Sequence, residues 1–367
     1  MAANDFVRQW EEIRDDALLA VDRVGASGWL ILGEEVAELE RELARWWGFE
    51  HAVGVASGLD ALEIALRSAG IEAGARVVTT PLTAFATTLA IARIGATPVW
   101  CDVEQSGGLD LEQVRLALES DELISAVVPV HLYGHPLDPG RLAALAQTYG
   151  VIVIEDCAQS AGAARDGLPT GAAGKVAATS FYPTKNLGAM GDGGALLTND
   201  GTIAERAARL RNYGQRARYE HTELGLNSRL DELHAAVLRS AMLPRLGEWL
   251  ARRREIAARY TQALGDGPLR PILQTGGDSA HHLFPVESMT IPASEAVDAL
   301  ALRGVSAGRH YPRLCPDQPA AGGLGDSLGA LPVARRIAER ELSLPIHPFL
   351  GDDEVEHVIE AVVEICA

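Results

Sequence analysis

Lysine is rare in this chain, and one of its two lysines lies in a stretch that could do chemistry. The sequence has 32 basic residues, of which only Lys175 and Lys185 are lysines. Lys185 lies in SFYPTKNLGAMGDGG, residues 180 to 194. A lysine amine can lose its proton and attack an aldehyde to form a Schiff base, which a permanently charged guanidinium cannot do. Lys185 is therefore a candidate anchor for an aldehyde cofactor, of which pyridoxal phosphate is the obvious one, whereas Lys175 is expected to be a solvated charge before a strand.

A pyridoxal site needs a carboxylate facing the ring nitrogen, and VIVIEDCAQSAG (151–162) offers one. Asp156 closes an apolar run at the carboxyl end of a strand, where α/β sheets place their ligands. Glu155 points to the opposite face in a regular strand, so the two carboxylates cannot serve together. The alternative for Asp156 is a helix cap. Gln159, about one turn further on, could contact the ring oxygen of the cofactor.

A phosphate group needs backbone amides at a helix start together with hydroxyl groups. Ser57 and Gly58 lie at such a turn in VASGLDALEIAL, and Ser180 supplies a hydroxyl five residues before Lys185. Phe85 follows another strand and could cover the ring. Each of these features alone is also typical of an ordinary turn or core residue.

Two other kinds of site are disfavoured. His131 and His135 in HLYGH are followed by Pro136, and this composition predicts a loop in which the spacing would not align two metal ligands. No GxGxxG follows a strand, which argues against a nicotinamide enzyme.

The elements that must position these residues alternate along the first 200 residues. About seven apolar strands alternate with amphipathic helices, which predicts an α/β fold with a mainly parallel sheet covered on both faces. Two helices are expected before them, over 5–24 and 33–47, and long helices after them, over 202–212 and 229–264. Shorter strands are expected near 281–290 and 305–311. We predict a large domain over 1–249 and a smaller α+β domain over 250–367.

Composition narrows the class of protein. The net charge of −18 disfavours binding to nucleic acid or to an anionic membrane. The start of the chain does not look like a secretory signal, and no apolar run of about 20 residues occurs. The four cysteines show no zinc or disulfide spacing. We expect a cytoplasmic protein.

Several long stretches together resemble the DegT/DnrJ/EryC1/StrS family of pyridoxal-phosphate-dependent nucleotide-sugar aminotransferases. They run in the family's order from about residue 30 to the C-terminus. The matching stretches are GVASGLDALEIALRSAGI, VVPVHLYGHPLD, VIVIEDCAQSAGA, SFYPTKNLGAMGDGGALLTND, LRNYGQRARYEHTELGLNSRLDELHAAVL, HYP (310–312) and LSLPIHP (342–348).

The resemblance implies the fold type I aminotransferase architecture, a homodimer with active sites at the subunit interface, and transfer of an amino group from L-glutamate to a dTDP-linked keto sugar. It also assigns roles to individual positions. The implied catalytic residues are Lys185 and Asp156. The implied cofactor-binding residues are Ser57, Gly58, Leu59, Phe85, Asp156, Gln159, Ser180, Lys185 and Asn227, the last reaching the partner subunit's cofactor. The implied substrate-binding residues are Arg229, His310 and Tyr311.

The sequence departs from the family pattern in two places. Leu59 replaces a common threonine, so its phosphate contact could only be a backbone amide. The loop RLCPDQPAAGG places Cys315 and Asp317 where a histidine and a tyrosine-containing motif are common. Ser57–Leu62 and LRNYGQRARYEH are similar to members that aminate carbon 3.

Alternatives to amination at carbon 3 stay open. They are amination at carbon 4 of a keto hexose or keto pentose, and a catalytically silent relative that binds the cofactor or a nucleotide sugar. Lys185 argues against the sugar dehydratases of the family, which have histidine there. The amino sugar could serve a secondary metabolite or a surface glycan.

Overall fold

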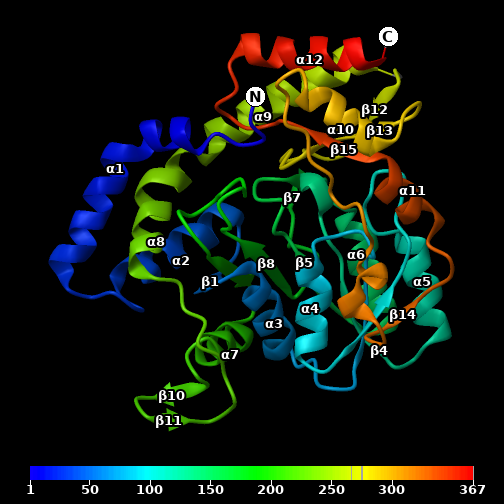
Figure 1. Ribbon diagram of the computed structural model, residues 1–367. Coiled ribbons are helices and arrows are strands. Elements are labelled where there is room, and N and C mark those ends of the chain that lie inside the picture. Colours follow the sequence, from blue (N-terminus) through cyan, green and yellow to red (C-terminus); the bar gives the residue numbers. More distant parts are fainter. Residues whose placement is uncertain (266, 274–275, 367) are drawn as a thin grey trace.

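A large sheet forms the centre of the molecule (Figure 1). The computed structural model describes residues 1–265, 267–273 and 276–366, the last without its side chain. The sheet has the strand order β1-β9-β8-β5-β4-β2-β3-β14. Its strands are β1 (His51–Val55), β2 (Arg76–Thr79), β3 (Thr97–Trp100), β4 (Ile124–Val128), β5 (Ile152–Asp156), β8 (Val176–Ser180), β9 (Gly194–Thr198) and β14 (Asp326–Ser327). Only β9 runs antiparallel to its neighbours. The seven strands expected before residue 200 are therefore confirmed, and β14 is an eighth that arrives from the C-terminal part.

Helices cover both faces of this sheet. Successive side chains of a strand point to opposite sides, and here both sets are apolar, so both faces must be buried. Val176 and Ala178 pack against α3 (Gly58–Ser68), α4 (Phe85–Arg93) and α7 (Gly201–Leu210). Ala177, between them, faces the side of α1 (Phe6–Ser27), α2 (Glu34–Trp47) and α8 (Glu232–Val237). Further along the same side lie α5 (Leu111–Ser120) and α6 (Pro139–Tyr149). The sheet is thus the middle of three layers, as the continuous apolar strands predict.

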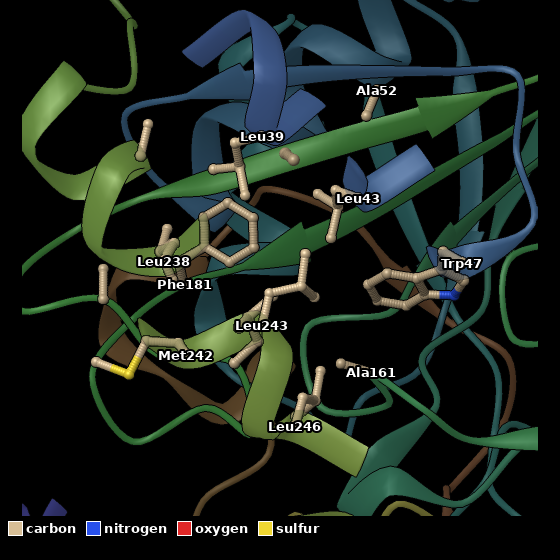
Figure 2. Close-up of a cluster of buried hydrophobic side chains, with 14 of the residues drawn as sticks. Leu39, Leu43, Trp47, Ala52, Ala161, Phe181, Leu238, Met242, Leu243 and Leu246 are labelled. Atoms are coloured by element: carbon tan, nitrogen blue, oxygen red, sulfur yellow. The ribbon is translucent and has the colours of Figure 1, made fainter. Parts of the chain in front are cut away.

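The apolar cluster beside α2 holds the segment that leads to Lys185. In Figure 2, Leu39, Leu43 and Trp47 of α2 surround the same space as Phe181 and Leu243. Phe181 follows the last residue of β8 and is 1% exposed. Its backbone amide donates to Gly193 O (2.8 Å), and its carbonyl accepts from Ala189 N (2.7 Å). The chain on either side of Lys185 is therefore tied to the core.

The first two helices differ slightly from the prediction. Helix α1 continues through Gly25 and ends at Ser27, where it is capped by Gly28 with a φ of 66°. Helix α2 has no side-chain cap of its own at Gly33. Instead, the buried carboxylate of Glu232 on α8 accepts from the amides of Gly33, Glu35 and Val36. A residue nearly 200 positions away thus satisfies the amides at the start of α2.

A second, smaller sheet lies above the large one in the view of Figure 1. It consists of β12 (Leu269–Pro271), β13 (Phe284–Ser288) and β15 (Glu341–Leu344). It packs against α9 (Leu246–Leu264), α10 (Ala293–Ala301) and α12 (Asp352–Cys366), with α11 (Pro332–Arg340) beside β13. The remaining strands form the short pairs β6 (Ala164–Arg165) with β7 (Leu168–Pro169), and β10 (Gln215–Ala217) with β11 (Glu220–His221).

Two predicted elements of this part are wrong in detail. Residues 305–311 form no strand, and Gly308 makes only an isolated bridge to Ser343 of β15. The expected helix over 229–264 is broken between α8 and α9 by a π-helical turn, Leu238–Met242, and a 3₁₀ turn, Leu243–Arg245. Pro244, inside the second turn, cannot donate the backbone hydrogen bond that a continuous helix needs.

Helix α9 connects the two parts. Its first residues, including Trp249 and Leu250, pack in the cluster beside α2, and its later residues, including Ile256 and Tyr260, pack in the small-sheet cluster. The domain boundary at residues 249 and 250 stays a prediction. Within the described residues, no helix has the length and apolarity needed to cross a membrane.

Candidate active site

A tight loop carries Lys185 into a cavity of about 250 Å³. The backbone amide of Lys185 donates to Tyr182 O (2.8 Å). Gly188 closes the loop, and a Cβ there would lie 2.4 Å from Pro183 O, so a larger residue does not fit. Gln159, His310 and Tyr311 line the same cavity. Lys185 is therefore placed with three of the residues that the sequence singled out.

The amine of Lys185 has no hydrogen bond or ion pair among the residues that the structure describes. Burial lowers the pKa of Lys185 to about 8, and the charge of Asp156 partly offsets this effect. An amine with this pKa is partly neutral at physiological pH, which is the form that attacks a carbonyl carbon. Lys175, in contrast, is exposed immediately before β8, as predicted.

Asp156 is the last residue of β5 and is 4% exposed. Its Oδ2 accepts from Thr87 Oγ1 (2.8 Å), and its Oδ1 accepts from Ala158 N (3.1 Å). Burial raises the pKa of Asp156, whereas these hydrogen bonds and the charge of Lys185 lower it. The carboxylate is thus held in place at the carboxyl edge of the sheet, close enough to Lys185 for their charges to interact. Thr87, on the first turn of α4, carried no signal in the sequence.

Glu155 belongs to a separate network on the other side of β5, as strand geometry predicted. Its carboxylate accepts from Gly171 N (3.0 Å) and Gly174 N (2.6 Å) and lies 2.8 Å from His131 Nε2. His131 Nδ1 accepts from Leu137 N (3.1 Å), so the ring proton is on Nε2 and points to Glu155. This network is structural and leaves Asp156 as the carboxylate of the site.

The side chain of Gln159 connects two neighbouring segments of the cavity wall. Its Oε1 accepts from Tyr133 N (2.6 Å), and its Nε2 donates to Tyr311 Oη (3.2 Å). Tyr133 Oη donates to His310 O (2.8 Å). The peptide bond between His310 and Tyr311 is cis. These contacts fix the amide orientation of Gln159 and leave its second N–H available.

The start of α3 packs directly against the end of β8. A Cβ at Gly58 would lie 2.6 Å from Ser180 Cβ, and a Cβ at Gly194 would lie 2.5 Å from Ser57 O. Ser57 caps the helix by accepting from Asp60 N (3.1 Å). The amides of Gly58 and Leu59 have no acceptor within the described part of the chain. Two free amides and two hydroxyl groups therefore meet at a helix N-terminus, which favours an anion.

Phe85 begins α4, two residues before Thr87, and is half-buried. It packs against the buried cluster of Trp100, Cys315 and Ala321. Cys315 thus lies beside the proposed ring cover, whereas Asp317 forms an ion pair with Arg335 (2.7 Å).

Asn227 and Arg229 do not line the cavity of Lys185. Asn227 is exposed. Arg229 donates to Asn212 Oδ1 (3.1 Å), and its guanidinium lies 5.2 Å from the centre of the Tyr213 ring. Ser228, between them, accepts from Ala56 N (3.1 Å) and donates to Asp60 Oδ2 (2.8 Å), so this segment lies beside the start of α3.

The residues present fit pyridoxal phosphate. Within the described residues, the unpartnered amine of Lys185 is close enough to the Asp156 carboxylate for their charges to interact, and one of the two free amides of α3 belongs to Gly58, at which no Cβ fits. These features supply an anchor for an aldehyde, an acceptor for a protonated ring nitrogen and a cradle for a phosphate group.

Comparisons with known proteins agree with this fit. The model of the DegT/DnrJ/EryC1/StrS aminotransferase family matches residues 11–363. The chain is 42% identical over 363 residues to dTDP-3-amino-3,4,6-trideoxy-alpha-D-glucose transaminase of Streptomyces venezuelae, covering 98% of this chain and 94% of that protein. It is 39% identical over 366 residues to a pleiotropic regulatory protein of Geobacillus stearothermophilus, covering 98% and 97%. The crystal structure of S. venezuelae DesV in complex with a ketimine intermediate superposes with a TM-score of 0.94 at 42% identity, covering 99% of this chain and 97% of that one.

Proposed function

The chain belongs to the DegT/DnrJ/EryC1/StrS aminotransferase family, and from this premise we propose that it moves an amino group from L-glutamate to carbon 3 of a dTDP-linked keto-deoxy sugar. It is a pyridoxal-phosphate-dependent nucleotide-sugar aminotransferase with the fold type I architecture. The choice of carbon 3 rests on the S. venezuelae relative, whose name specifies a 3-amino sugar, and on the motif Ser57–Leu62.

One observation carries the proposal. The only lysine in the cavity has an amine without a partner in the described chain, and this amine interacts electrostatically with the buried Asp156. A structural lysine would have an acceptor, whereas a lysine that must bond covalently to a cofactor needs a free amine.

The proposed contacts to the cofactor follow from the donors and acceptors of each side chain. Asp156 faces the ring nitrogen, and its raised pKa makes it a good acceptor for a ring N–H. Gln159 offers its second N–H to the ring oxygen. Phe85 covers the ring. The phosphate contacts are assigned to Ser57, Gly58, the backbone amide of Leu59, Ser180 and the partner subunit's Asn227.

Pyridoxal phosphate supplies an aldehyde and an electron-withdrawing ring to this site. Lys185 would hold the cofactor through its aldehyde until the amino donor displaces the lysine amine. The free amine of Lys185, with its pKa of about 8, would then accept a proton from the donor's alpha carbon and deliver it to the carbon of the cofactor's aldehyde group. Asp156 keeps the proton on the ring nitrogen during this transfer. Arg229, His310 and Tyr311 are proposed to contact the substrates.

We further propose a homodimer with the active sites at its interface. Three consecutive apolar residues between α1 and α2 are exposed, namely Trp29, Leu30 and Ile31. Ile31 forms a bridge with Asp231, four residues after the exposed Asn227. An apolar patch near an asparagine whose side chain has no hydrogen bond within the described residues fits a contact with a second copy of the chain.

The visible absorption spectrum tests the first half of this reaction. With pyridoxal phosphate, the purified protein is expected to show the band of cofactor bound to Lys185, and L-glutamate is expected to convert it to the pyridoxamine form. If no band forms, the assignment of Lys185 is wrong. If glutamate leaves the band unchanged, either the donor differs or the protein does not transaminate.

The second half is tested with nucleotide keto sugars. Restoration of the band by a dTDP-linked 3-keto sugar, with NMR identification of a 3-amino product, is the expected result. A 4-amino product from a 4-keto sugar would instead support the alternative position.

A further inference from the structure

A chain of hydrogen bonds leads from the cavity to a buried carboxylate that the proposed function does not use. His310 Nδ1 lies 2.9 Å from Ser343 Oγ, and Ser343 Oγ donates to Glu341 Oε1 (2.5 Å). Glu341 and Ser343 are neighbours on one face of β15, and Glu341 is 1% exposed. The other oxygen, Glu341 Oε2, accepts from the backbone amide of His310 (2.6 Å). One oxygen of the carboxylate thus contacts the backbone of His310 directly, and the other reaches the His310 ring through Ser343.

The opposite nitrogen of the ring is free for a ligand. His310 lines the cavity with Lys185, and its Nε2 has no partner in the part of the chain that the structure describes. Burial and, to a smaller extent, the charge of Lys185 lower the pKa of His310 to about 4, so the ring is neutral near pH 7. A neutral imidazole carries one N–H and one lone pair, and its neighbours decide which nitrogen has which.

The direction of the Ser343 hydroxyl proton determines which ring nitrogen of His310 is protonated. A serine hydroxyl has a single proton, and here the proton is directed to the Glu341 carboxylate in a short, charge-assisted hydrogen bond. Ser343 Oγ can then only accept from His310, so the ring proton lies on Nδ1. The Nε2 lone pair is left facing the cavity.

We propose that Glu341 and Ser343 order the protons along this chain so that His310 Nε2 accepts a hydrogen bond from a hydroxyl group of the sugar substrate. This inference rests on the proposed function for the identity of the substrate. Phosphate groups and the carboxylates of L-glutamate are acceptors at neutral pH and would be repelled by the lone pair. The sugar hydroxyls are the matching donors. Glu341 and Ser343 are positioning residues that act through His310.

The hydrogen bonds that link Glu341, Ser343 and His310 can reverse their donors and acceptors. Burial raises the pKa of Glu341 to about 7, against the hydrogen bonds from Ser343 and His310 and the charge of Arg309, which lower it. A protonated Glu341 donates to Ser343 Oγ, Ser343 then donates to Nδ1, and Nε2 carries the ring proton. The other titratable or charged groups that lie near these hydrogen bonds are Lys185, His282, Tyr133, Tyr311, Glu287 and Arg336.

Glu341→Gln should fix the reversed order at every pH. The His310 amide still requires an acceptor, so the carboxamide oxygen takes that position and its NH₂ group donates to Ser343 Oγ. Ser343 must then donate to Nδ1. The expected consequence is a KM for the keto sugar about tenfold higher, because the sugar hydroxyl must turn its own proton away from Nε2 before it can accept from the ring and so loses the hydrogen bond that it donated. The half-reaction with L-glutamate should be unchanged.

The experiment combines kinetics with ¹⁵N NMR of histidine-labelled holoenzyme, with His310→Gln to assign the signals. Wild type is expected to show the Nδ1–H form of His310 above pH 7 and a shift toward Nε2–H as Glu341 gains a proton. Glu341→Gln should show Nε2–H throughout, Ser343→Ala should lose the pH step, and Ser343→Thr should retain it. The exposed Glu339→Gln makes the same charge change and should match wild type in both assays.

The NMR measurement needs no sugar substrate, so it judges the proton order separately from the proposed reaction. An unchanged His310 pattern in Glu341→Gln, or equal losses toward sugar and glutamate, would overturn the inference. If Glu341→Gln does not fold, the pH step in wild type and its loss in Ser343→Ala decide the question.

Discussion

The reactivity of Lys185 can be measured without cofactor or substrate. Burial lowers its pKa to about 8. An ordinary lysine has a pKa of about 10.4, so at pH 7.5 roughly one in a thousand of its amines is neutral, whereas for Lys185 the neutral fraction is about one quarter. The structure therefore predicts a roughly 200-fold larger fraction of reactive amine.

Competitive acetylation of the cofactor-free protein with acetic anhydride tests this value. The chain has only two lysines, and the exposed Lys175 is an internal reference in every sample. Mass spectrometry gives the extent of modification of each peptide as a function of pH. Limited access to the cavity lowers the acetylation rate of Lys185 by the same factor at every pH. It does not move the midpoint of the curve of rate against pH, which is expected near pH 8.

The sign of the neighbouring charge gives an independent check. The Asp156 carboxylate raises the pKa of Lys185, because it stabilises the ammonium form. Asp156→Asn should therefore move the midpoint to lower pH. A midpoint at or above pH 10 in the wild type, or a rise in Asp156→Asn, would refute the account of how burial and charge tune this amine.

Three further predictions concern the cofactor site. Lys185→Arg and Lys185→Ala should both lower kcat by at least about a hundredfold, and near-normal turnover by the arginine variant would remove Lys185 from the mechanism. Gly58→Ala should weaken pyridoxal phosphate binding by about tenfold or more, since the new Cβ meets Ser180, as seen in an absorption titration. Gly25→Ala, in open space on α1, is the matched control, and equal affinities of the two variants would count against a tight cradle. Mixing inactive Lys185→Ala with Asn227→Ala and allowing the subunits to exchange should restore up to about a quarter of the wild-type sites, because a mixed dimer holds one site with both residues intact. No recovery in a mixture that demonstrably forms mixed dimers would contradict a contact of Asn227 across the interface.

The sequence predicted the large sheet well because its strands are continuous apolar runs. The same reasoning could not find β14, since two residues have no pattern and this strand exists only by pairing with β3. It also predicted a strand at 305–311, where the local composition suits a strand but β15 offers only a single bridge at Gly308.

The site was predictable where residue chemistry is specific. Lysine, aspartate and a glycine at a helix start each have a distinctive role, and the structure brings Lys185 and Asp156 within range of each other's charge. Thr87 and Glu341 escaped notice because a threonine in a helix and a glutamate at the start of a strand are common. Their importance comes from burial against distant parts of the chain, which a local pattern does not contain.

Helix α9 has a thermodynamic consequence. Leu250 is packed in one hydrophobic core and Ile256 in the other, and six residues of helix span only about 9 Å. Between them, the buried Arg253 donates to the carbonyls of His281, His282 and Ile346. Neither core can lose its structure without fraying the helix that the other needs and exposing these carbonyls. Heat or denaturant should therefore melt both parts in one cooperative transition, although the chain has two sheets.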